Sequence, residues 1–141
     1  KGLVIAPNKI DLIKKSGNYS IKSQIYESAP FLKAIPLIPI SALNGTRIEQ
    51  LLSTAQAIFH EENKWVDRTA LSRLFKGLNQ PSARNRIYSI TQVNAAPPVF
   101  SVSAKDRLPS GYLRYLENQI RNCFGFAGVP IIIKTRISRR R

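Results

Sequence analysis

The sequence contains no methionine and only one cysteine, one tryptophan and one histidine in 141 residues. A chain without an initiator methionine is expected to be a piece of a longer protein. The single cysteine, Cys123, excludes an internal disulfide framework and is typical of a reducing cytoplasm. Cys123 falls on the apolar face of a predicted helix, where we expect a buried thiol rather than a nucleophile. The histidine, His60, has no clustered cysteines or carboxylates nearby, so no metal site is predicted and we expect a helix-surface residue.

Long apolar runs and acidic residues are also scarce. No stretch reaches the roughly 18 apolar residues of a transmembrane helix, and the first apolar run is too short for a signal peptide. The chain has 22 Lys and Arg against 8 Asp and Glu, a net charge of +14. Residues 61–141 alone hold 15 Lys and Arg, eleven of them Arg, against 5 Asp and Glu. Guanidinium groups match phosphate oxygens in bidentate geometry, so this excess predicts contact with RNA. The alternative is a basic protein whose charge only keeps it soluble.

Residues 1–62 have the pattern of alternating strands and helices. The apolar segments 3–6 and 35–40 are typical of buried parallel strands. Between them, Ser20 can cap a short helix that ends near Pro30. This order predicts the closing part of an α/β doubly wound domain, with too few strands for a complete one.

A longer helix is predicted after the second of these strands. Thr46 and Glu49 have the spacing of a capping box, which marks the start of a helix. The apolar residues that follow recur at helical spacing and define one face: Ile48, Leu51, Leu52, Ala55, Ile58 and Phe59.

Residues 63–141 carry a different pattern, in the order α-β-β-α-β. We expect a helix capped by Thr69, strands at 87–93 and 99–104, a helix at 108–123 and a strand at 131–137. On the second helix, Glu117 and Arg121 should form an i,i+4 pair on the outside. The chain is therefore predicted to hold two domains, 1–62 and 63–141, and the second is a small α+β domain with a three-stranded sheet and helices on one face.

Two short polar motifs follow the two predicted strands of the first domain. Asn8-Lys9-Ile10-Asp11 follows the first strand, and Ser41-Ala42 follows the second. Guanine presents N1–H and a 2-amino group side by side, and the Asp11 carboxylate can accept both, whereas adenine has no donor at position 1. We therefore predict guanine recognition. The alternative is a polar turn that caps the following helix.

The other residues of these motifs have matching roles in the guanine hypothesis. The aliphatic stem of Lys9 can lie over the base, and Asn8 can tie the two loops together. Ala42 has to be small so that its backbone N–H can approach the guanine O6.

Asn-Lys-x-Asp followed by Ser-Ala-Leu-Asn-Gly resembles the fourth and fifth guanine-nucleotide motifs of translation-class GTPases. Three later runs resemble the C-terminal domain of the Der/EngA family. They are Tyr…Thr-Gln-Val…Pro-Pro-x-Phe in residues 88–100, Tyr-Leu-Arg-Tyr-Leu-Glu-Asn in residues 112–118, and Phe-Gly-Phe-x-Gly-x-Pro-Ile in residues 124–131. By this resemblance, the first domain is the end of a P-loop GTPase domain and the second is a KH-like domain.

The resemblance implies a protein that binds GTP or GDP with Mg²⁺, hydrolyses GTP in the cytoplasm and acts in maturation of the large ribosomal subunit. Its KH-like domain would contact ribosomal RNA and the upstream first GTPase domain. The guanine site would consist of Asn8, Lys9, Asp11, Ser41, Ala42 and Leu43. No Gly-x-x-x-x-Gly-Lys-Ser/Thr motif occurs in the chain, so phosphate and Mg²⁺ binding would come from upstream residues. We assign no catalytic residue and no metal ligand, and we expect this chain alone to be inactive.

RNA contact would depend on charge, because the Gly-x-x-Gly loop of RNA-binding KH domains is missing from its usual place between two helices. Gly125-Phe-Ala-Gly128 fits that pattern, but it lies between a helix and a strand and is interpreted as a helix C-cap turn. The candidate RNA contacts are Arg84, Arg86, Arg136, Arg139, Arg140 and Arg141, each of which is otherwise a solvated surface charge. Tyr88 and Phe100 are expected to pack in the core rather than stack on bases.

Two other functions fit parts of this pattern. One is a non-enzymatic RNA- or ribosome-binding module in which the Asn-Lys-x-Asp motif is vestigial. The other is a related GTPase with a genuine KH domain, such as Era, and the misplaced Gly-x-x-Gly argues against it.

Overall fold

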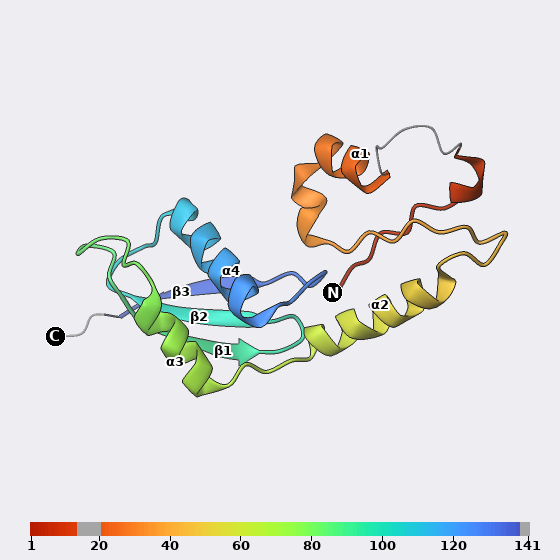
Figure 1. The fold of residues 1–141 in the computed structure, drawn as a ribbon. Helices are drawn as coiled ribbons and strands as arrows, with labels where there is room; N and C mark the ends of the chain where they lie inside the picture. The colour runs from red at the N-terminus through yellow and green to blue at the C-terminus, as the bar shows by residue number, and fades with distance from the viewer. Residues whose placement is uncertain (14–20, 139–141) are drawn as a thin grey trace. The chain divides into compact units, whose positions relative to one another are not determined.

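The computed structural model describes residues 1–13 and 21–138, and its backbone contacts divide the chain into two compact units (Figure 1). One unit consists of Gly2–Glu61 together with Ala127–Val129. The other consists of Glu62–Phe126 and Pro130–Arg141, together with Lys1. The three-residue turn at 127–129 therefore belongs with the first unit although its neighbours in sequence belong with the second.

In the first unit, the two predicted strands run side by side in parallel. Ile5 and Leu37 form a parallel bridge, and backbone hydrogen bonds of 2.7 to 2.9 Å continue the pairing on either side. The pairing remains an isolated bridge rather than a full ladder, because Pro7 has no N–H to donate to the carbonyl of Ile38. The prediction that both segments are buried was only half right: Leu37 is buried, but Leu3 is 51% exposed.

The helices of the first unit are mostly short. The predicted short helix is confirmed as α1, which ends two residues before Pro30. Its expected cap, Ser20, lies outside the described residues. The helical segments are η1 (Ile10–Leu12), α1 (Ile21–Ser28), η2 (Pro30–Ala34) and α2 (Ile48–Glu62).

The start of α2 differs from the prediction of a capping box at Thr46. Thr46 pairs with Ser41 through two backbone hydrogen bonds of 3.0 and 3.2 Å. This antiparallel bridge closes a tight turn, and Arg47 follows it with a left-handed φ of 61°. The helix can therefore begin only at Ile48.

The apolar face predicted for α2 is covered at one position. Ile58 is 6% exposed, whereas Leu52 and Phe59 are 60% and 64% exposed. Within this unit, the bend at Gly128 packs on Ile58, because a Cβ added to Gly128 would lie 3.0 Å from the Ile58 side chain. Ile48 and Leu51 are partly buried, and the other members of the stripe are exposed.

The second unit confirms the predicted α-β-β-α-β order. Its elements are α3 (Arg68–Gly77), β1 (Ile87–Asn94), β2 (Val99–Ala104), α4 (Ser110–Phe124) and β3 (Ile132–Ile137). The sheet has the order β1-β2-β3, with β1 and β2 antiparallel and β2 and β3 parallel. Helices α3 and α4 lie on the same face of this sheet, as predicted (Figure 1).

The core of the second unit lies between the sheet and its two helices, α3 and α4 (Figure 1). Alternate residues of β2 point toward the helices, as expected for a sheet with one covered face. The Phe100 and Phe126 rings meet edge to face, with centroids 5.9 Å apart. Phe100 therefore packs in the core, as predicted. The side chains with no exposed surface are Phe100, Val102, Ala104, Leu116, Ile120 and Phe126.

Two details of the helices differ from the sequence-based predictions. Helix α3 is capped by Asp67 rather than Thr69: the Asp67 carboxylate accepts the N–H of Ala70 at 2.9 Å. This hydrogen bond holds the pKa of Asp67 below its usual value. Cys123 is exposed rather than buried. The buried stripe of α4 runs through Leu116 and Ile120 at a spacing of four residues, and Cys123 falls beside it.

The predicted ion pair of α4 is present, and its arginine also donates a hydrogen bond to the turn after the helix. Arg121 contacts Glu117 Oε1 through Nη2 at 2.9 Å and through Nε at 3.1 Å. Its Nη1 donates to the carbonyl of Phe126 at 2.7 Å, so the pair is half-buried rather than on the outside. Gly125, with φ 86°, caps the helix, which confirms the C-cap interpretation of Gly125–Gly128. Arg121 thus ties the end of α4 to the turn that follows it.

We expect Arg121→Met to destabilise the second unit by about 1.5–3 kcal/mol, because hydrogen bonds to a charged group are lost and the Phe126 carbonyl loses a donor. Methionine keeps an apolar stem of similar length, so the packing loss is small. Arg114 lies exposed on the same helix, and Arg114→Met should change the free energy of unfolding by less than about 0.5 kcal/mol. Urea denaturation of both variants measures the difference, and equal midpoints would contradict the role given to Arg121.

Candidate functional site

The two predicted guanine loops lie next to each other. The Asn8 side-chain oxygen accepts the backbone N–H of Ala42 at 3.0 Å and that of Lys9 at 2.7 Å. The N–H of Ile10 donates to the carbonyl of Ile40 at 3.1 Å. The loops meet because parallel strands end at the same edge, where ligands of α/β folds bind. Residues 34 positions apart in sequence therefore form one surface.

Ser41 holds the Asp11 carboxylate in place. The Ser41 hydroxyl donates a short hydrogen bond to Asp11 Oδ1 and accepts the N–H of Asn44 at 3.4 Å. Ser41 itself is 1% exposed, whereas Asp11 is exposed to solvent. The result is an exposed carboxylate of defined orientation, a group that can accept two neighbouring N–H donors. This orienting role of Ser41 was not predicted from the motif.

The remaining predicted residues surround this carboxylate. Lys9 has a left-handed backbone, with φ 68°, and is exposed. Ala42 and Leu43 are exposed too, Leu43 by 85%. One detail differs from the expected geometry: the Ala42 N–H, predicted to reach guanine O6, donates to Asn8. All six predicted residues thus lie on this pair of loops.

Within the described residues, no three His, Cys, Asp or Glu side chains lie close enough together to hold a metal ion. In the same part of the chain, no helix is long and apolar enough to cross a membrane.

Two of the predicted RNA contacts come together at one end of the sheet in the second unit. Arg86 directly precedes β1, and its carbonyl accepts the N–H of Lys105, which follows β2, at 2.8 Å. Arg136 of β3 lies opposite Ser103 near the same end of β2. Lys105 was not predicted, because only strand pairing brings it beside Arg86. Arg139, Arg140 and Arg141 lie outside the described residues.

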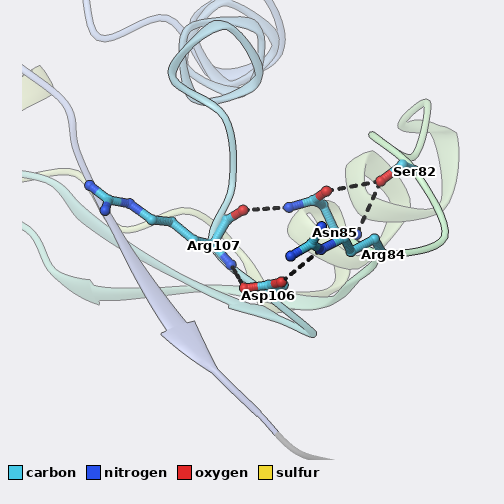
Figure 2. Close-up of polar contacts among 5 residues, drawn as sticks. All are labelled: Ser82, Arg84, Asn85, Asp106 and Arg107. Carbon is cyan, nitrogen blue, oxygen red and sulfur yellow. Dashed lines mark hydrogen bonds and ion pairs between the residues drawn. The ribbon is translucent and has the colours of Figure 1, made fainter.

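Arg84, another predicted RNA contact, takes part in a network between two loops (Figure 2). Its Nε lies 3.2 Å from Asp106 Oδ2, and Asp106 Oδ1 accepts the N–H of Arg107 at 2.7 Å. Asn85 donates to the carbonyl of Arg107 and accepts from the hydroxyl of Ser82 at 3.0 Å. The N–H of Arg107 and the Arg84 guanidinium lower the pKa of Asp106. Asp106 therefore offsets the charge of Arg84, although that side chain is 85% exposed.

Comparison with known proteins identifies the domain. Residues 63–136 match the family model described as the KH-domain-like C-terminal domain of EngA bacterial GTPase enzymes. The three-stranded α+β unit is thus a KH-like domain. Since this match covers more than half of the chain, the chain belongs to the Der/EngA family.

Curated relatives match over most of the chain. It is 37% identical to GTPase Der of Caldanaerobacter subterraneus over 96% of its length, and 35% identical to GTPase Der of Fusobacterium nucleatum over 94%. It is 33% identical to GTPase Der of Chloroflexus aggregans over 100% of its length. The aligned region is 33–34% of each relative, so the chain spans about a third of the proteins it matches.

Proposed function

We propose that this chain belongs to a GTPase that acts in maturation of the large ribosomal subunit, and that its loops at 8–11 and 41–43 recognise guanine. The observation that carries the proposal is the exposed Asp11 carboxylate, oriented by buried Ser41 at the edge where two parallel segments end. A carboxylate held in this way suits the paired donors of guanine and excludes adenine.

The surroundings of Asp11 fit a guanine base. The Ser41 hydroxyl takes one acceptor position of Asp11 Oδ1, and a carboxylate has about four lone-pair sites, so both base donors can still be accepted. The exposed stem of Lys9 can cover one side of the base. Guanine O6 would compete with Asn8 for the N–H of Ala42, so binding requires that this hydrogen bond is shared or exchanged. Asn8 then positions the loops before the base arrives.

Phosphate and Mg²⁺ binding is not among the roles proposed for these residues. The chain has no Gly-x-x-x-x-Gly-Lys-Ser/Thr motif. Other residues of a longer protein would therefore hold the phosphates and the Mg²⁺ ion. The Mg²⁺ ion would stabilise the charge on the transferred phosphoryl group. The relatives are named GTPase Der, and this supports hydrolysis by such a protein. Within this chain the contribution is base selection.

The KH-like domain supplies the proposed ribosomal part of the function. Residues 61–141 carry 15 Lys and Arg against 5 Asp and Glu, a charge that favours association with ribosomal RNA. By family resemblance, the domain would also contact the first GTPase domain of the same protein.

Asn8→Ala tests the pairing of the two loops. In the complete gene product we expect GDP and GTP to bind about 10-fold more weakly, since the hydrogen bond that joins the loops is lost. ATP binding should stay undetectable. Titration with a fluorescent guanine nucleotide measures the change.

The matched control for this variant is Asn122→Ala, the same change at an exposed position of α4. It should leave the guanine affinity unchanged. Wild-type affinity in Asn8→Ala would overturn the proposed loop pairing, and equal binding of ATP and GTP by the wild type would favour a vestigial motif.

A further inference from the structure

The face of the sheet opposite the helices in the KH-like domain is lined by hydroxyl groups. On β2, Phe100, Val102 and Ala104 have no exposed surface, whereas Ser101 and Ser103 alternate with them and are partly exposed. Alternate residues of a strand point to opposite faces, so these serines lie on the face away from α3 and α4. This open face is the part of the domain that its own helices do not cover.

Strand register extends this pattern across the sheet in two rows. In the first row, Ser101 pairs with Thr91 of β1 and with Lys134 of β3. In the second row, Ser103 pairs with Ser89 of β1 and with Arg136 of β3. Each row therefore reads hydroxyl, hydroxyl, cation. The four hydroxyl residues and Arg136 line a depression of about 450 Å³.

The charge of this face is of one sign. None of the strands β1, β2 and β3 contains an acidic residue. Across residues 1–13 and 21–138, neither Lys134 nor Arg136 has an ion-pair partner. Arg86 and Lys105 add two more cations at the end of the sheet, while Asp106 is engaged with Arg84. An anion approaching the open face meets cations and hydroxyl donors without a competing carboxylate.

We propose that this open face, defined by Ser89, Thr91, Ser101, Ser103, Lys134 and Arg136, binds the sugar–phosphate backbone of double-stranded RNA. The inference rests on the proposed association with ribosomal RNA and assigns it to a surface. Hydroxyl groups bind phosphate oxygens as donors, and they pair with ribose 2′-OH groups as donors or acceptors. The two rows lie about 6.6 Å apart along the strands, a spacing suited to neighbouring phosphates.

The chemistry of the face favours RNA backbone over two other occupants. Protein interfaces have apolar and aromatic residues at their centre, but the lining of this depression contains no aromatic residue and one large apolar residue, Ile137. Recognition of single-stranded bases needs aromatic platforms for stacking, which the lining does not provide. A shallow polar face with cations at one side matches the wide minor groove of an A-form duplex, where 2′-OH groups are displayed.

The test compares two double variants of the 141-residue chain that remove the same charges. Lys134→Gln with Arg136→Gln changes the open face, and Lys76→Gln with Arg114→Gln changes exposed residues of α3 and α4. Fluorescence anisotropy with an RNA duplex of about 16 base pairs, over a series of salt concentrations, gives affinity and salt dependence. Circular dichroism verifies that both variants fold.

For the open-face variant we expect binding to weaken roughly 10- to 100-fold and the slope of log K against log salt to become shallower by about 1.4–1.8, as two phosphate contacts disappear. The helix variant should lose less than about 3-fold. Ser101→Ala with Ser103→Ala should weaken binding about 3- to 10-fold with an unchanged slope, since hydroxyls carry no charge. A DNA duplex of equal length should bind more weakly.

Equal losses in the two charge variants, unchanged binding in the serine variant, or equal binding of DNA would each overturn the assignment of this face. If the wild-type chain binds RNA but the face variants behave like the control, the proposed RNA association stands and only the surface is wrong. If the wild-type chain does not bind the RNA duplex at all, the proposed RNA association and the assignment of the open face are both wrong. Binding of guanine nucleotides by the complete gene product is measured separately and does not depend on either result.

Discussion

Asp11→Asn is expected to change the nucleotide preference of the complete gene product from GTP to xanthosine triphosphate. The amide that replaces the carboxylate still accepts N1–H, but its NH₂ group faces the 2-amino group of guanine, and two donors cannot pair. Xanthine has a carbonyl at position 2, which accepts that NH₂ group. We expect GTP affinity to fall on the order of 10³- to 10⁴-fold, as for other sites that lose a matched polar partner. Competition binding with both nucleotides measures the exchange.

Two further variants make this result specific. Glu49→Gln makes the same acid-to-amide change at an exposed position in the first turn of α2 and should leave GTP binding unchanged. Ser41→Ala removes the hydroxyl that orients Asp11 and should weaken guanine binding about 10-fold without creating a preference for xanthine. Unchanged GTP affinity in Asp11→Asn would show that Asp11 does not read the base.

Phe100→Ala is expected to have the largest effect on the stability of the KH-like domain, about 3–5 kcal/mol. Phe100 has no exposed surface, lies on the central strand of the sheet, and packs edge to face against Phe126. Truncation removes the buried ring and leaves a cavity that the surrounding strands and α4 fill only in part. Hydrogen exchange of the β1 and β2 amides, measured in increasing urea, reports the free energy of unfolding of this unit.

Trp65→Ala is the control, because it also replaces an aromatic residue of the same unit by alanine, on a side chain that is 61% exposed. It should alter the free energy of unfolding by less than about 0.5 kcal/mol. A loss of similar size in both variants would contradict the core position of Phe100.

Elements with a strong local signal were predicted correctly from the sequence. The order α-β-β-α-β, the Gly125 C-cap and the pair Glu117–Arg121 all depend on residues within a few positions of one another. Errors arose where the local backbone geometry differed from what residue spacing alone indicated. Thr46 has the spacing of a helix cap, but its bridge to Ser41 delays the helix. Cys123 was expected on the buried face of α4, but that face runs through Leu116 and Ile120, and Cys123 is exposed beside it.

The same division applies to the two candidate sites. The motif residues Asn8, Asp11, Ser41 and Ala42 were identified from their positions after two predicted strands, and the structure places them on adjoining loops. The hydrogen bond from Ser41 to Asp11 joins residues 30 positions apart and could not be read from either motif. The hydroxyl rows of the open face were not predicted at all. Each of the three strands contributes only two of the six residues, and only strand pairing brings them together.

The sequence by itself determined the family, the order of elements, the residues of the proposed guanine loops and the excess of positive charge, because each of these depends on composition or on short runs of residues. Only the tertiary structure decided which groups became neighbours: Ser41 beneath Asp11, Lys105 beside Arg86, and three strands whose outward side chains form a single polar face. The physical reason is that strand pairing brings together residues far apart in the chain, and the register of that pairing depends on side-chain packing over the whole sheet.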